Sequence, residues 1–117
     1  MELALASAIQ NFGESHPHVV GRQSTLGHVY SAMKNHSKAK ELFAQALGTL
    51  QKKWGENHES VATAQENYGG ACLFLEEFEE GGQALAKSYK IRLAAFGANH
   101  PKTKDSKAFL ARFGFKV

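Results

Sequence analysis

Apolar side chains recur along this chain at spacings of three and four residues, which is the period of an amphipathic α-helix. The spacing predicts a first helix over residues 17–34, whose apolar face carries Val20, Leu26, Val29, Tyr30 and Met33. It predicts a second helix over residues 37–54, with Ser37 as the N-cap and an apolar face of Ala39, Leu42, Phe43, Ala46, Leu47 and Leu50. Because each apolar face must be buried away from water, the two helices should pack antiparallel against each other.

The same pattern returns in a second block, over residues 59–96. Its two apolar faces are Ala64, Tyr68, Ala71, Cys72 and Leu75, and then Leu85, Tyr89, Leu93 and Phe96. Three breaks of the form G-x-x-H frame the blocks at a fixed distance of 42 residues: Gly13 and His16, Gly55 and His58, Gly97 and His100. A period of this length predicts a stack of repeats, each of which buries its apolar face on its neighbours.

The flanking pieces read as half-repeats. Residues 1–12 align with the end of a second helix, and residues 101–113 align with a first helix that lacks its partner. The chain is therefore either cut from a longer array or able to pair its open ends with another copy. At the second end we expect a partly exposed apolar patch that favours self-association, made of Phe109, Leu110, Phe113 and Phe115.

Small residues recur where facing helices should approach most closely, namely Gly27 with Ala39 and Gly69 with Gly81. The first block resembles the tetratricopeptide repeat, through Leu26-Gly27, Tyr30, Ala39, Phe43 and Ala46 at that family's spacing. The 42-residue period and the G-x-x-H-P break resemble the longer subclass found in kinesin light chains. In the second block Cys72, Gly81 and Ser88 depart from the pattern, which predicts looser packing there.

The resemblance implies an all-α protein, a right-handed α-solenoid of antiparallel helix pairs. We expect about six helices, as two full repeats plus half-repeats at both ends, in a single domain over residues 1–117. It also implies a non-catalytic interaction or adaptor module that binds a protein or peptide segment along the first helix of each repeat. The lining implied for this groove is Ser24, Thr25, His28, Ser31, Glu66, Asn67, Gly70, Phe74 and Arg112.

Two features qualify that groove. Its positions are polar or small, which is also what any solvated helix face presents. Only Asn67 matches the asparagine pair usual in kinesin-light-chain repeats, and the Glu66 carboxylate should repel an acidic ligand. Binding of acidic cargo segments is therefore not expected.

Composition narrows the class of protein further. Hydrophobic residues make up 43% of the 117 positions, enough for a core, and the one cysteine, Cys72, cannot form an intramolecular disulfide. No segment approaches the length of a membrane span. We expect a soluble cytoplasmic protein.

Charge is unevenly distributed along the chain. Residues 54–80 hold seven acidic and no basic residues, whereas residues 81–117 hold eight basic residues and one acidic one. The basic side chains are Lys87, Lys90, Arg92, Lys102, Lys104, Lys107, Arg112 and Lys116. They leave a nucleic-acid-binding solenoid open as an alternative, although no known reading module accompanies them.

The repeated histidines could suggest a metal site. Equivalent positions in stacked helix pairs lie at least one helix spacing apart, too far to share a zinc ion, so no metal and no cofactor are expected. A structural role is simpler: glycine ends one helix in the left-handed conformation, and the histidine cluster begins the next. His58-Glu59 is not a zinc-protease motif because Ala62 stands where the second histidine is needed. The sequence therefore predicts no enzyme.

Overall fold

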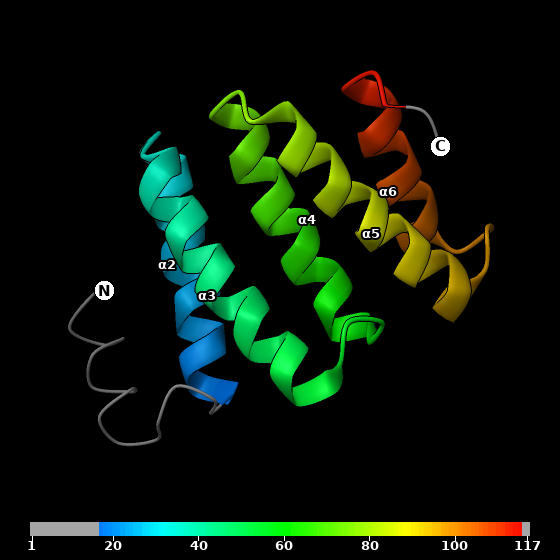
Figure 1. The fold of residues 1–117 in the computed structure, drawn as a ribbon, viewed down its shortest axis with the longest axis horizontal. Coiled ribbons are helices and arrows are strands. Elements are labelled where there is room, and N and C mark those ends of the chain that lie inside the picture. The colour runs from blue at the N-terminus through cyan, green and yellow to red at the C-terminus, as the bar shows by residue number, and fades with distance from the viewer. Residues whose placement is uncertain (1–16, 116–117) are drawn as a thin grey trace.

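The computed structural model describes residues 17–115, and within them it is entirely helical (Figure 1). The five helices are α2 (Pro17–Ala32), α3 (His36–Trp54), α4 (Glu59–Phe74), α5 (Phe78–Phe96) and α6 (Pro101–Arg112). Each packs on the next along the chain, α2 on α3 through to α5 on α6. The predicted class, a solenoid of antiparallel helix pairs, is confirmed. The half-repeat predicted for residues 1–12, with Gly13 and His16, lies outside the described residues.

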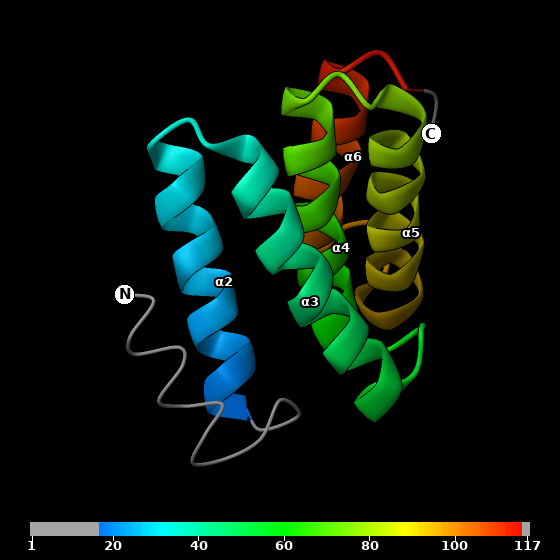
Figure 2. The same cartoon turned by 60° about the vertical axis from the view of Figure 1, so that its left-hand side comes forward.

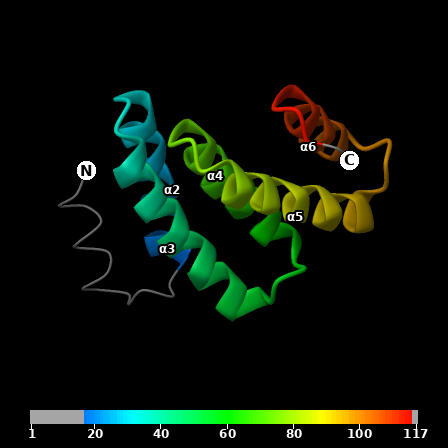
Figure 3. The ribbon, with the colours of Figure 1, turned by 45° about the horizontal axis from the view of Figure 1, so that its top comes forward.

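The helices form two rows. Figures 1 and 3 show the first helices of the repeats, α2, α4 and α6, along one side of the stack, and the second helices, α3 and α5, along the other. Figure 2 shows α2 and α3 joined by a short turn at one end, with α4 beside α3. Each second helix therefore has a first helix packed on either side of it.

The turns repeat with the sequence. Lys34 and Glu76, 42 residues apart, both have φ of 63° in the turns that follow α2 and α4. Gly55 and Gly97, also 42 residues apart, both have φ of 83°. Their ψ angles are 170° and 168°, so the expected left-handed helical conformation is wrong: the positive φ needs glycine, but the backbone is extended.

The predicted N-cap of the second helix is also wrong by two residues. Asn35, not Ser37, caps α3, because its side-chain oxygen accepts a hydrogen bond from the backbone N–H of Lys38 at 3.3 Å. The amide oxygen of asparagine reaches the third helical N–H from that position, so the helix begins at His36.

The core follows most of the predicted apolar faces, and two residues leave it. Met33 is 66% exposed because α2 ends at Ala32 and residue 33 no longer follows the helical period. Leu93 is 38% exposed. It lies two steps of four residues after the buried Leu85, and each step adds about 40° around the helix axis, so the Leu93 side chain is rotated by about 80° away from the core. Ile91 takes the interior place instead.

The small-residue pair Gly69 and Gly81 brings α4 and α5 into close contact. A Cβ atom placed on either glycine would lie 3.0 Å from the carbonyl oxygen of the other. Gly27 instead makes room for the Phe43 ring, because a Cβ there would lie 2.6 Å from it. Cys72 and Ser88, two of the residues that depart from the pattern in the second block, are fully buried.

Candidate protein-interaction surface

The residues predicted to line a groove lie on α2, α4 and α6, the row of first helices. Five are partly buried, namely Ser24, Ser31, Glu66, Asn67 and Gly70, and four are exposed, namely Thr25, His28, Phe74 and Arg112. A Cβ on Gly70 would meet nothing within 4 Å, so the backbone of α4 is open to approach there. We refer to these nine positions as the first-helix face.

Two aromatic contacts mark the edges of this face. The His28 ring meets the Phe43 ring edge-on, with centroids 5.0 Å apart. Phe74 is 64% exposed and stacks on His36, the first residue of α3, at 4.4 Å with the rings nearly parallel. The face therefore ends at an apolar ring that is held in place and still accessible.

Glu66 is held in a partly buried polar network that was not predicted from the sequence. Its Oε2 atom lies 2.7 Å from Nη1 of Arg92 and accepts a hydrogen bond from the Ser106 hydroxyl at 3.2 Å. The Arg92 guanidinium also donates to the hydroxyls of Ser106, at 2.7 Å, and Thr63, at 3.3 Å. Thr103 adds a hydrogen bond from its hydroxyl to the backbone carbonyl of Arg92 at 3.2 Å.

This network joins α4, α5 and α6, and its charges cancel. The Arg92 side chain is only 8% exposed, so Arg92 does not belong to the basic surface predicted for the last third of the chain. The repulsion of acidic ligands expected from a free Glu66 carboxylate does not arise, because that carboxylate is paired with Arg92. The signal in the sequence is a charged residue, Arg92, among the apolar positions of α5, with an acidic residue, Glu66, 26 positions earlier.

A second polar cluster joins α3, α4 and α5. The Lys40 ammonium donates a hydrogen bond to Glu77 and lies 3.6 Å from Glu80, and the Tyr68 hydroxyl donates to Glu80. The bond to Glu77 raises the pKa of Lys40, and the bond from Tyr68 lowers the pKa of Glu80. Burial raises the pKa of the Tyr68 hydroxyl and of the Cys72 thiol.

This cluster has the composition of a metal site but not its electrostatics. One ligand atom each from Cys72, Glu77 and Glu80 lie within 4.8 Å of one another. The Lys40 ammonium already pairs with both carboxylates and would repel a metal cation, and the raised pKa of the buried thiol opposes the thiolate that a metal would need. We assign the cluster a structural role.

The repeated histidines begin helices. The Nδ1 atoms of His58 and His100 each accept a hydrogen bond, at 3.1 Å, from the backbone N–H two residues later. Each ring also stacks on the aromatic residue that ends the preceding helix, His58 on Trp54 at 4.7 Å and His100 on Phe96 at 4.3 Å. The sequence analysis did not predict that each histidine would both cap a helix and stack on an aromatic ring. The available signal was an aromatic residue four positions before each histidine.

The apolar end predicted at α6 is smaller than expected. Leu110 is 1% exposed, and Phe115 packs over Gly82, where a Cβ would lie 2.5 Å from the ring. Phe109 is partly buried and Phe113 remains 43% exposed. The chain folds its last aromatic residue back onto α5, so a patch of four aromatic and aliphatic side chains is not present.

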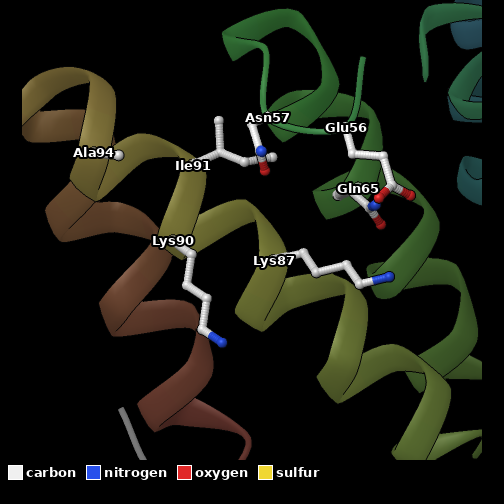
Figure 4. Close-up of a pocket in the computed structure, with 7 residues that line it drawn as sticks. All are labelled: Glu56, Asn57, Gln65, Lys87, Lys90, Ile91 and Ala94. Carbon is white, nitrogen blue, oxygen red and sulfur yellow. The ribbon is translucent and has the colours of Figure 1, made fainter. Parts of the chain in front are cut away.

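Two neighbouring hollows lie beside α5, and both reach Gln65 on α4. The first, about 190 Å³, is shown in Figure 4 and lined by Glu56, Asn57, Gln65, Lys87, Lys90, Ile91 and Ala94. We call it the Gln65 pocket. The second, about 350 Å³, runs between α3 and α5 and shares Gln65 and Lys87 with the first. Neither was predicted; a glutamine among the buried residues of α4 was the available signal.

Residues 19–60, which span α2, α3 and the break before α4, match the family model of the tetratricopeptide repeat. This chain carries a tetratricopeptide repeat. The predicted family is thereby confirmed, and tetratricopeptide repeats generally mediate protein–protein interaction.

Solved structures extend the likeness of fold over nearly the whole chain. Crystal structures of nearly identical TPR-like repeats assigned to a kinesin light chain of Podosopora anserina, and of a variant of it, superpose with a TM-score of 0.88 at 23% identity. They cover 95% of this chain, which in turn covers 53% and 52% of theirs. The fold of these TPR-like repeats therefore extends over both blocks.

One curated relative is much longer. The clustered mitochondria protein homolog of Candida albicans is 24% identical over 106 residues, which are 91% of this chain and 8% of that protein. The chain thus spans a small part of the relative and about half of the solved repeats. Among the helices described here, none is long and apolar enough to cross a bilayer.

Proposed function

We propose that this chain is a non-catalytic adaptor module whose first-helix face binds an extended segment of a partner protein. The observation that carries the proposal is the tetratricopeptide match, on a stack that aligns its first helices along one side. Repeats of this kind use the surface formed by successive equivalent helices, because the small rotation between repeats turns that surface into a continuous track. The proposed location is the cytoplasm, where the buried free thiol of Cys72 would remain reduced.

The side chains of the face suggest how a segment would be held. His28 and Asn67 offer hydrogen-bonding groups on neighbouring first helices, and both reach the surface at least partly. The open backbone at Gly70 allows a partner side chain to approach α4 closely, and Phe74 supplies an exposed ring for an apolar anchor. Arg112 adds a cation at the far end of the row.

The test is a pull-down or proximity labelling with the full chain, comparing wild type with a His28→Ala, Asn67→Ala double variant. Gly70→Arg is a second variant: it fills the open site on α4 and does not disfavour the helix. The matched control is Lys52→Ala with Gln83→Ala, two exposed residues on the second helices. Partners should be lost from the first two variants and retained by the control. If every partner survives both variants, the first-helix face is not the binding surface.

Nucleic-acid binding is the second candidate, favoured by the exposure of α6. Lys102, Lys104, Lys107 and Arg112 are all exposed on this one helix. A labelled RNA titrated at several salt concentrations would give an affinity that falls steeply with salt if these cations contact phosphates. Unchanged affinity after Lys104→Gln with Lys107→Gln would exclude this surface.

Self-association is the third candidate and rests on charge. Exposed Glu76, Glu79 and Glu80 gather at the turn between α4 and α5, whereas exposed cations dominate α6. A head-to-tail contact between copies could pair these surfaces. Sedimentation of the chain at high micromolar concentration tests this candidate, and a strictly monomeric mass would refute it.

A further inference from the structure

Exposed aromatic side chains lie on both sides of the turn between α4 and α5. Phe74, the last residue of α4, and Phe78, the first residue of α5, are 64% and 55% exposed. Figures 1 and 2 show this turn at the end of the stack where α2 also turns into α3, and Met33 in that neighbouring turn is exposed as well. Apolar side chains that gather at one exposed edge mark a surface for contact with another molecule.

The two rings have different surroundings. The Phe74 ring is held by its stack on the His36 ring, so one of its faces is covered and its conformation is fixed before binding. Phe78 lies in the lining of an open hollow of about 360 Å³, together with Glu77, Glu79, Glu80 and Gln83. The edge thus offers a fixed ring at the end of α4 and room for a partner's side chain at the start of α5. A side chain that is already fixed loses little conformational entropy on binding.

The charge around the rings is negative. Glu76, in the turn, and Glu79, in the first helical turn of α5, are exposed and form no ion pair within residues 17–115. The neighbouring carboxylates of Glu77 and Glu80 are both paired with Lys40. An occupant of this edge therefore needs cationic groups for two free carboxylates as well as apolar contacts for two rings. We call Phe74, Glu76, Phe78 and Glu79 the turn surface.

The rings and the carboxylates select the same side chain. An arginine guanidinium donates two parallel hydrogen bonds to one carboxylate, and it also stacks flat on an aromatic ring. It is more weakly hydrated than the lysine ammonium, so it gives up water more readily when it is covered by a protein surface. Phenylalanine rings beside unpaired glutamates therefore favour arginine over lysine.

We infer that the turn surface docks an arginine-containing segment of a partner protein. The guanidinium groups pair with Glu76 and Glu79, and an apolar side chain of the same segment packs on Phe78. Phe74 also belongs to the first-helix face, but the other three residues lie outside it, so this docking does not depend on that face. A second copy of the chain is a poorer occupant, because Arg112 is the one arginine among the exposed cations of α6.

The experiment is fluorescence anisotropy of the labelled peptide Arg-Leu-Arg-Arg-Leu-Arg, titrated with the full chain. Its matched control carries citrulline in place of each arginine, which keeps the shape of the side chain and removes the charge. The citrulline peptide should bind at least about tenfold more weakly, and a lysine peptide should fall between the two. Added salt should weaken binding of the arginine peptide.

The test variant is Glu76→Gln with Phe78→Ser, two exposed positions whose replacement should leave the circular dichroism spectrum unchanged. It should bind the arginine peptide about tenfold more weakly, since one charge and one apolar anchor are lost. The control is Glu56→Gln with Trp54→Ser, an exposed acidic and aromatic pair at the break between α3 and α4. The His28→Ala, Asn67→Ala variant of the first-helix face should retain the affinity, which separates the two surfaces.

Three results would each overturn the inference. The first is equal binding of the arginine and citrulline peptides, and the second is unchanged affinity in the Glu76 and Phe78 variant. The third is a self-association of the chain in sedimentation that this variant loses while the peptide does not bind, because the occupant would then be a second copy.

Discussion

Removal of the Glu66 carboxylate should be among the most damaging single changes in this chain. Glu66→Ala would leave the Arg92 guanidinium, whose side chain is 8% exposed, without a counter-charge. The hydroxyls of Ser106 and Thr63 would still accept hydrogen bonds from it, but a hydroxyl cannot neutralise a buried cation.

The expected magnitude follows from the burial of the two partners. Breaking a buried ion pair from one side typically costs about 3–5 kcal/mol. The Glu66 side chain is 26% exposed, so water can partly reach the site and the lower end of that range applies, about 3 kcal/mol. The free energy of unfolding of a whole domain is typically about 5–15 kcal/mol, so this loss is a large part of it. The loss corresponds to a fall of roughly 12 °C in melting temperature.

The assay is urea and thermal unfolding followed by circular dichroism. The double variant Glu66→Leu, Arg92→Leu removes both charges and should recover most of the loss, because paired apolar replacements of buried ion pairs are often close to neutral. The exposed pair of Lys38 and Glu41, 3.9 Å apart, serves as control, and Glu41→Ala should cost no more than about 0.5 kcal/mol. A loss below about 1 kcal/mol for Glu66→Ala, typical of surface pairs, would refute the reasoning.

Three further predictions concern packing, capping and pH. Gly81→Ala should lower the free energy of unfolding by about 1–3 kcal/mol, because its Cβ would meet the α4 backbone. Gly70 faces open space, so Gly70→Ala should raise the free energy of unfolding by up to about 1 kcal/mol in the same urea titration. His58→Ala should cost about 1 kcal/mol and leave partner capture unchanged; loss of capture at an unchanged melting temperature would give His58 a binding role instead. The hydrogen bond from the Tyr68 hydroxyl lowers the pKa of Glu80 from its ordinary 4.5. This bond therefore stabilises the fold above pH 4.5, and its contribution is lost as the pH falls through the lowered pKa of Glu80. Tyr68→Phe should therefore differ from wild type at pH 7 and approach it in acid, and a constant difference across urea titrations at each pH would contradict this.

The sequence was sufficient for features that depend on nearby residues. The 42-residue period, the glycine and histidine at each described break and the apolar period of each helix all reflect local backbone preferences, and the structure reproduces them at Gly55 and Gly97. Errors at this level were small: the cap moved from Ser37 to Asn35, and the glycine backbone is extended rather than left-handed helical.

The candidate site was less accessible to sequence reasoning. The first-helix face followed from the resemblance, but the engagement of Glu66 by Arg92 and Ser106 joins three helices and has no local pattern. The same holds for the Gln65 pocket, because its lining comes from α4, α5 and the loop before α4.

The sequence by itself thus determined the helices, their repeat and their order, because a helix is set by hydrogen bonds and side-chain contacts within a few residues. Only the tertiary structure decided which polar side chains are buried and paired, and which apolar ones remain outside. Leu93 is exposed and Arg92 beside it is buried, although periodicity favours the reverse. That outcome depends on α4 and α6, which bring a carboxylate and two hydroxyls to the one position where the guanidinium can be neutralised.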